Sequence, residues 1–231
     1  MITIRTSTVQ VQREQVTAAQ WVSGLNQGRK TLEALAGSNI TALDLRDCSR
    51  LLPEDYALLL EMPKLVDLKI GGFGINDKVP EYVAALPNLS GLTIEDAMIS
   101  PEAFARMLET AAWKPKLAQL ILSRNTTLFD DAILPVRHLP KLKRLTVNGM
   151  MVTGRFLAQL AENEDARPKL ETLSLQKSLL TVDGAQALSR YRELKSLDLS
   201  GVAVTDELAE ILATLDWPET IILTENRISE N

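Results

Sequence analysis

The chain has 231 residues, of which 45% are hydrophobic, and its 25 lysines and arginines against 30 aspartates and glutamates give a net charge of −5. This acidic balance provides no counterion release on a phosphate backbone, so we expect neither nucleic acid nor a membrane surface as a partner. A single cysteine, no signal peptide at the polar start and no apolar run of about 18–20 residues predict a soluble, cytoplasmic protein.

Residues 1–39 are expected to form an N-terminal helical cap. Thr17 and Gln20 have the spacing of a capping box. Apolar residues follow at helical spacing: Ala18, Trp21, Val22 and Leu25, then Leu32 and Leu35. Two alternatives stay open at this stage, namely an independent recruiting segment and a degenerate repeat that begins near Ile2 and Ile4.

A repeat begins at residue 40 and continues to the end of the chain. Segments of the form L-x-x-L-x-L start at residues 40, 65, 89, 117, 142, 170 and 194, with a weaker copy at 218. In each copy the last two apolar residues, such as Leu43 and Leu45, are two positions apart and point to the same side of a strand. One short strand cannot bury that side alone, so the strands must stack and form continuous apolar ladders.

Each strand is expected to be followed by a turn and a helix. Another apolar residue stands ten positions after the start of most copies, and a helix-capping residue usually follows it. Ser100, Pro101 and Glu102 are the clearest case, with a hydroxyl, a proline and an acid in the order that begins a helix. A proline two residues before the next strand, as in Pro-Lys-Leu at 140–142, ends the helix and returns the chain to the sheet.

This pattern resembles that of the leucine-rich repeat (LRR) family, and it covers residues 40–228. The resemblance implies an α/β solenoid, a curved horseshoe with parallel strands on its concave face and helices on its convex face. About eight repeats would then fill residues 40–231. Repeats of about 25 residues with convex helices look closest to the ribonuclease-inhibitor-like or cysteine-containing subclasses. The family's asparagine position is mostly apolar here, which predicts apolar packing in place of a hydrogen-bonded ladder: Cys48, Phe73, Ala97, Asn125, Met150, Ser178, Val202 and Asn226.

The repeats also differ in length. Repeats 3 and 5 each have four extra residues, at 109–114 and 161–167, and we expect two longer helices that stand out from the convex face. The chain stops at Asn231 without a closing helix, so Ile221, Leu223 and Ile228 would face an uncovered end. We expect this to be either a fragment of a longer array or an edge that meets another chain, including a second copy.

Candidates for catalysis are few, and we expect no enzyme activity, cofactor or metal site. The only histidine, His138, rules out a His/Cys metal cluster, and a Cys–His pair would require Cys48 from three repeats away. Gly71–Gly74 has no Gly-Lys-Ser/Thr ending and is more typical of a tight turn than of a phosphate loop. The acidic run 162–165 reads as a solvated loop, and Trp113 and Trp217 as core residues.

The concave face is the expected site, and strand alternation gives its outward residues. Those chosen as candidate binding residues are Asp44, Arg46, Asp67, Lys69, Glu95, Gln119, Arg144 and Asn148. The predicted function is a non-catalytic scaffold that binds another protein through this surface. The alternative is the recognition domain of a larger bacterial effector or ligase, whose catalytic part lies outside this chain. A third reading places the partner on the convex helices or at the C-terminal end.

Overall fold

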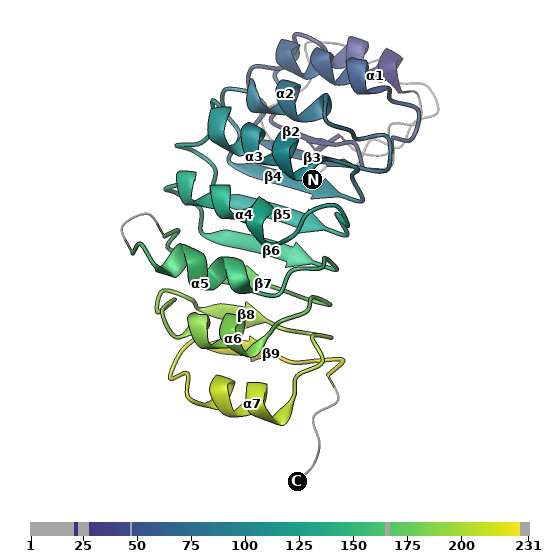
Figure 1. Cartoon of the computed structure of the whole chain (residues 1–231). Helices are drawn as coiled ribbons and strands as arrows, with labels where there is room; N and C mark the ends of the chain where they lie inside the picture. Colours follow the sequence, from purple (N-terminus) through teal and green to yellow (C-terminus); the bar gives the residue numbers. More distant parts are fainter. Residues whose placement is uncertain (1–20, 23–27, 47, 165–166, 227–231) are drawn as a thin grey trace.

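The computed structural model describes residues 21–22, 28–46, 48–164 and 167–226. In this part of the chain nine strands form a single sheet, in which each strand pairs in parallel with its sequence neighbours (Figure 1). The strands are β1 (Trp21–Val22), β2 (Ala42–Asp44), β3 (Asp67–Gly71), β4 (Gly91–Glu95), β5 (Gln119–Ser123), β6 (Arg144–Asn148), β7 (Thr172–Ser174), β8 (Ser196–Asp198) and β9 (Thr220–Ile222).

Helices connect the strands and lie together on one face of the sheet (Figure 1). They are α1 (Arg29–Leu35), the 3₁₀ helix η1 (Pro53–Glu61), α2 (Val79–Ala84), α3 (Pro101–Thr110), α4 (Asp130–Ile133), the 3₁₀ helix η2 (Leu134–His138), α5 (Arg155–Ala161), α6 (Val182–Leu188) and α7 (Asp206–Ala213). This alternation is the predicted α/β solenoid. None of these helices has the length and apolar character needed to cross a membrane.

The predicted apolar ladders fill the space between the sheet and the helices. The register places Leu43 beside Leu68, and the row continues through one leucine per strand to Leu197 and Ile221. The leucines of this row from β2 to β8 have no exposed surface. Because every repeat adds one residue to each ladder, neighbouring repeats share one continuous core.

Helix starts follow the predicted capping pattern. The hydroxyls of Ser100, Thr181 and Thr205 accept hydrogen bonds from the third residue beyond, at 3.2–3.4 Å. Between α5 and α6 the backbones approach closely at Gly154 and Gly184, where an added Cβ on Gly184 would lie 2.6 Å from the Thr153 carbonyl oxygen. Glycine is required there because no larger residue fits between the two helices.

The prediction of a helix face that includes Trp21 and Val22 is wrong. These residues form β1, which pairs with Ala42 and Leu43 of β2. A β-branched and an aromatic residue suit a strand, and pairing with β2 covers an edge that a helix would leave open. The second pair of apolar residues in that prediction, Leu32 and Leu35, does lie in a helix: both are buried residues of α1. The expectations for residues 1–20 and Leu25 lie outside the described residues.

The expectation of two longer helices is correct for one of them. At 10 residues, α3 is the longest α-helix in the described chain. By contrast, α5 has 7 residues and ends at Ala161, so the extra residues of that repeat lie beyond the helix. The acidic side chains of Glu162 and Glu164 are exposed there, as the prediction of a solvated run requires, whereas Asp165 lies outside the described residues.

The eight residues at the family's asparagine position are not mostly in apolar contacts, because some of them form hydrogen bonds. Asn125 is buried, accepts from the Ala97 amide at 3.0 Å and donates to the Ile94 carbonyl at 2.9 Å. Asn226 and Ser178 also donate to backbone carbonyls of the preceding repeat, at 2.8 and 3.0 Å. Four of the other positions are buried as predicted: Cys48, Ala97, Met150 and Val202. Phe73 contradicts the prediction, because it is 80% exposed.

Candidate functional site

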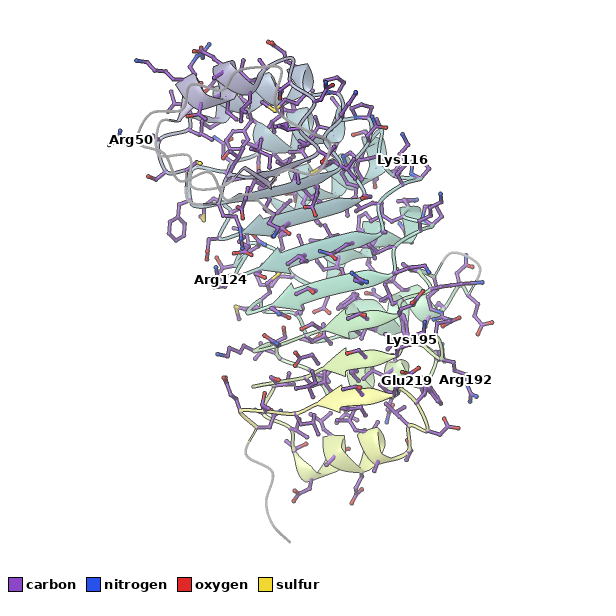
Figure 2. All side chains as sticks on the ribbon, turned by 180° about the vertical axis from the view of Figure 1, so that it is seen from behind. Arg50, Lys116, Arg124, Arg192, Lys195 and Glu219 are labelled. Atoms are coloured by element: carbon purple, nitrogen blue, oxygen red, sulfur yellow. The ribbon has the colours of Figure 1, made fainter. Side chains whose placement is uncertain are left out.

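The face of the sheet opposite the helices, here called the open face, carries the predicted site (Figure 2). Its central row is in register from strand to strand: Asp44, Lys69, Thr93, Ile121, Thr146, Ser174, Asp198 and Ile222. The rows on either side hold the remaining candidates, with Asp67, Gln119 and Arg144 in one and Glu95 and Asn148 in the other. Arg46 lies just beyond β2. The strand alternation therefore placed all eight candidate residues on one surface.

Charged side chains in the N-terminal half of the open face form one network. The Arg46 guanidinium contacts both carboxylate oxygens of Asp44 at 2.7 and 3.0 Å, and donates to Glu95 at 3.0 Å. The other Glu95 oxygen accepts from Arg124 at 3.3 Å, and Arg124 forms a two-pronged pair with Asp96 at 2.7 and 2.9 Å. Fork-shaped guanidinium contacts hold side chains in fixed geometry. The network thus links β2, β4 and the turn after β5.

Arg46 reaches Glu95 by crossing β3, and Gly71 makes this possible. A Cβ on Gly71 would lie 3.3 Å from Cγ of Arg46 and 3.0 Å from the carbonyl oxygen of Glu95. Any larger residue would therefore occupy the path of the arginine. From the sequence, Gly71 was interpreted only as part of a turn. In the structure it is the last residue of β3 and leaves the space through which Arg46 contacts Glu95.

A second glycine has the same role near the C-terminal end. Lys177 pairs with Glu225 at 3.0 Å, two repeats away. Between them lies Gly201, where an added Cβ would be 3.1 Å from Cγ of Lys177. In both places a long cation extends over a glycine to an acid on the second neighbouring repeat.

Two aspartates of the open face have opposite electrostatic environments. For Asp44, burial favours the neutral acid, but hydrogen bonds from the side chain and backbone of Arg46 outweigh it and lower the pKa. For Asp67, burial raises the pKa, the nearby charge of Asp44 adds to this, and Lys69 only partly opposes it. Asp67 lies over Gly91, whose added Cβ would be 3.1 Å from the carboxyl carbon. Asp67 is therefore a carboxylate that the fold leaves poorly compensated.

The C-terminal half of the open face is hydrogen-bonded with few charges. Asn148 Oδ1 accepts from the Ser174 hydroxyl and the Gln176 amide, both at 2.9 Å. Gln176 donates to Asp198 at 2.5 Å, and Asp198 also accepts from the Ser200 hydroxyl at 2.7 Å. Burial raises the pKa of Asp198, but these donors outweigh it and lower the pKa overall. This half is a polar surface that is already internally satisfied.

The middle of the open face lies between the charged network and the hydrogen-bonded network. Arg144 is exposed, and the hydrogen bonding of its side chain to the described residues is limited to a long contact of 3.4 Å with Gln119. Thr146 and Ile121 are half-buried beside it on neighbouring strands. Another molecule could contact these side chains without breaking an ion pair to any residue that the structure describes.

The residues weighed as catalytic candidates do not assemble. Cys48 is buried after β2, and His138 is exposed at the end of η2, three repeats later. In the described ranges no group of His, Cys, Asp and Glu side chains has the arrangement of a metal site. Gly72 has a φ of 103°, a turn conformation that suits glycine.

The two tryptophans predicted to be core residues, Trp113 and Trp217, differ in their exposure. Trp113 is fully buried and donates to the Val83 carbonyl at 2.8 Å, as expected of a core residue. Trp217 packs against the core but is only half-buried, with the Arg192 guanidinium 4.6 Å from its ring centre. Figure 2 shows Arg192 near Lys195 and Glu219, at the edge where strands begin.

Three residues of the charged network on the open face were not identified from the sequence: Arg124, Asp96 and Gly71. Arg124 and Asp96 occupy the left-handed turn position after their strands, with φ of 54° and 51°. Strand alternation gives no direction for a side chain in such a turn. The sequence does contain a signal for this pair, because Asp96 and Arg124 carry opposite charges at the same position of two successive repeats.

Comparisons with known proteins concern the fold. No protein-family model matches the chain, and no curated protein sequence does either. Among solved structures, a protein from Bacteroides fragilis is 19% identical with a TM-score of 0.56, over 87% of this chain and 60% of that protein. An internalin from Listeria monocytogenes is 16% identical with a TM-score of 0.46, over 90% of this chain and 53% of the internalin. A chain of the yeast Rad7 and Elc1 complex is 16% identical with a TM-score of 0.38, over 80% and 70%.

The class of protein follows from the repeats, the parallel sheet and its one-sided helices. The chain is an α/β solenoid of leucine-rich-repeat-like units. It spans less than two thirds of the Bacteroides protein and of the internalin.

Proposed function

We propose that the protein is a non-catalytic scaffold that binds another protein through its open face. The observation that supports this most is the arrangement of the sheet: its strands, in continuous register, present one polar surface, while the helices of the described residues lie behind it. Stacked repeats fix the spacing of these side chains, so the surface is rigid before a partner arrives.

The binding surface proposed is the N-terminal half and the middle of this face. It comprises Asp44, Arg46, Asp67, Lys69, Glu95, Gln119, Arg144 and Asn148. Both signs of charge are held in place there, and Asp67 and Arg144 have little compensation of their own. A protein surface of mixed polarity matches such a pattern, whereas a nucleic acid backbone would require a dominant positive charge. The partner is therefore proposed to be a protein.

Two finer features belong to the same proposal. The convex helices and repeat lengths of 24–28 residues favour the ribonuclease-inhibitor-like or cysteine-containing subclasses of leucine-rich repeats. A cytoplasmic location is supported by the single cysteine, which excludes an intrachain disulfide.

Affinity capture with matched variants tests the proposal. The open-face variant carries Ile121→Glu, Arg144→Glu and Thr146→Glu, which project from β5 and β6. The control carries Leu60→Glu, Arg137→Glu and Gln186→Glu on exposed positions of η1, η2 and α6, with the same change in net charge. We expect a protein from the native lysate to be retained by the wild type and the control and lost by the open-face variant. Retention by all three would refute binding through the open face.

A further inference from the structure

Six successive repeats each expose one large apolar side chain after their strand. These residues, here called the flank ridge, are Leu52, Phe73, Met98, Phe129, Met151 and Leu179, with exposed fractions between 47% and 80%. Every one lies between the end of a strand and the start of the next helix, so the ridge follows one flank of the solenoid. Figure 2 shows this flank on the side where Arg124 and Arg50 are labelled.

The core does not require these side chains. In each turn another apolar residue, one or two positions away, closes the turn against the core and is buried, for example Ile99 beside Met98 and Ile75 after Phe73. Scattered exposed apolar residues are ordinary, but a series of Phe, Met and Leu in the turns of six successive repeats marks an interaction surface. Phe and Met are also residue types that contribute strongly at such surfaces.

The turns that carry the ridge are stacked directly on one another. The amide of Met98 donates to the Ile75 carbonyl at 2.8 Å, and the amide of Leu179 donates to the Val152 carbonyl at 2.9 Å. Successive turns near the sheet are thus about 5 Å apart, and the ridge is about 24 Å long. An α-helix rises 5.4 Å per turn, so a helix of roughly 16 residues could place one apolar side chain against each repeat.

A line of acids runs beside the ridge, in the first turns of the helices that follow it. Glu102 of α3, Asp131 of α4 and Asp183 of α6 are exposed and make no ion pair with any described residue. Arg155 interrupts this line at α5.

Arg50 is a further exposed cation on this flank, whereas Arg124 and Lys177 are paired there with Asp96 and Glu225. With Asp77, which is also exposed, the acids that form no ion pair with a described residue outnumber the arginines that form none. The unpaired charge beside the ridge is therefore mainly negative and complements a positively charged partner.

One end of the ridge also has room for an inserted side chain. Beside Phe73 there is a hollow of about 490 Å³, whose lining includes the apolar side chains of Leu51, Tyr56 and Ile75 and, toward the open face, Arg46. Buried apolar walls with one exposed aromatic at the rim suit an apolar anchor.

We propose that the flank ridge binds a basic amphipathic α-helix of a partner protein. The apolar side of that helix lies along the ridge, and its lysines and arginines face the acids of α3, α4 and α6. This site adjoins the open face at the hollow beside Arg46, and it does not require that the open face binds anything.

The test uses the full chain and a labelled 18-residue helical peptide of leucine and lysine, with the leucines on one side. Two other peptides are compared: one with glutamate in place of lysine, and one with the same composition in scrambled order. Binding is measured by fluorescence anisotropy. We expect the helical leucine–lysine peptide to bind at least about tenfold more tightly than either other peptide.

Variants then locate the binding. The ridge variant is Phe73→Asn, Met98→Gln and Met151→Gln, and its control removes three exposed apolar residues elsewhere, Leu60→Gln, Val66→Gln and Ile222→Gln. We expect the ridge variant to bind at least about tenfold more weakly and the control to bind as the wild type does.

A charge pair of variants tests the acid line. Glu102→Gln, Asp131→Asn and Asp183→Asn should weaken binding several-fold at low salt, whereas Glu109→Gln, Glu162→Gln and Glu210→Gln, which remove exposed acids elsewhere, should not. The open-face variant should retain peptide binding, which separates this site from the proposed function.

Several results would overturn the proposal. No binding of the leucine–lysine peptide would do so, as would equal binding of the glutamate peptide or unchanged binding by the ridge variant. A dimer in sedimentation that the ridge variant abolishes would assign the ridge to a second copy instead. Ridge-dependent binding to phosphatidylcholine vesicles would assign it to a lipid surface.

Discussion

Replacement of Gly71 by alanine should destabilise the protein, although the general expectation is the opposite. The backbone of Gly71 is not among the positive-φ positions, so alanine can adopt its conformation. At such positions Gly→Ala usually stabilises a protein by about 0.4–1 kcal/mol, because the unfolded chain has less freedom.

The structure gives the size of the opposing effect. The new methyl group would lie 3.0 Å from the Glu95 carbonyl oxygen and 3.3 Å from Cγ of Arg46. The carbonyl belongs to the neighbouring strand and cannot move freely, and overpacking of this kind costs about 1–3 kcal/mol. Displacement of Arg46 would also break its contact with Glu95, which at a partly exposed site contributes about 0.2–1 kcal/mol. The net change expected is a loss of about 1–3 kcal/mol in the free energy of unfolding.

Urea unfolding followed by circular dichroism measures this change. Gly74→Ala is the matched control, because its nearest heavy atom to an added Cβ, the Leu51 carbonyl oxygen, is at an ordinary 3.7 Å. We expect the control to unfold at the same urea concentration as the wild type or a higher one. If Gly71→Ala were as stable as the wild type, the interpretation of Gly71 as the crossing point for Arg46 would be wrong.

Three further predictions concern single residues. Asn125→Ala should cost about 2–4 kcal/mol in urea unfolding, because the buried Ala97 amide and Ile94 carbonyl lose their partner, and the half-buried Asn226→Ala should cost less. Gly184→Ala should cost about 3 kcal/mol or more, despite the higher helix propensity of alanine, because its methyl group would collide with the Thr153 carbonyl; wild-type stability would refute this. Asp67→Asn should raise stability at pH 7, because the raised pKa of Asp67 means that its ionised form is disfavoured in the folded state. That gain should disappear as the pH falls through the raised pKa to below the ordinary value of 3.8, and a gain independent of pH would contradict the assignment.

The sequence predicted the repeat architecture well because the pattern is local and repeated. Leu43 and its counterparts in other strands have the same spacing in every copy, so one error in assignment would not change the register. The same period placed the outward rows of the open face correctly, including Asp44 opposite Lys69. Ser100 and Thr205 marked helix starts because capping depends on a few adjacent residues.

Features that depend on unique contacts could not be predicted in this way. Trp21 and Val22 were assigned to a helix because a pairing partner for a two-residue strand cannot be seen in a short segment. Phe73 was assigned to the interior by its repeat position, but the glycines on either side of it allow a turn that points outward. The contact between Arg46 and Glu95 requires that residue 71 is a glycine, and a hydrophobic pattern gives no information about such a requirement.

Site-specific photo-cross-linking tests the central claim most directly. A photoreactive phenylalanine analogue at Thr146, in the middle of the open face, is compared with the same analogue at Gln186, exposed on α6 behind the sheet. The account predicts that the captured partner protein is cross-linked from position 146 and not from position 186. Cross-linking from position 186 alone, or from both positions equally, would contradict it.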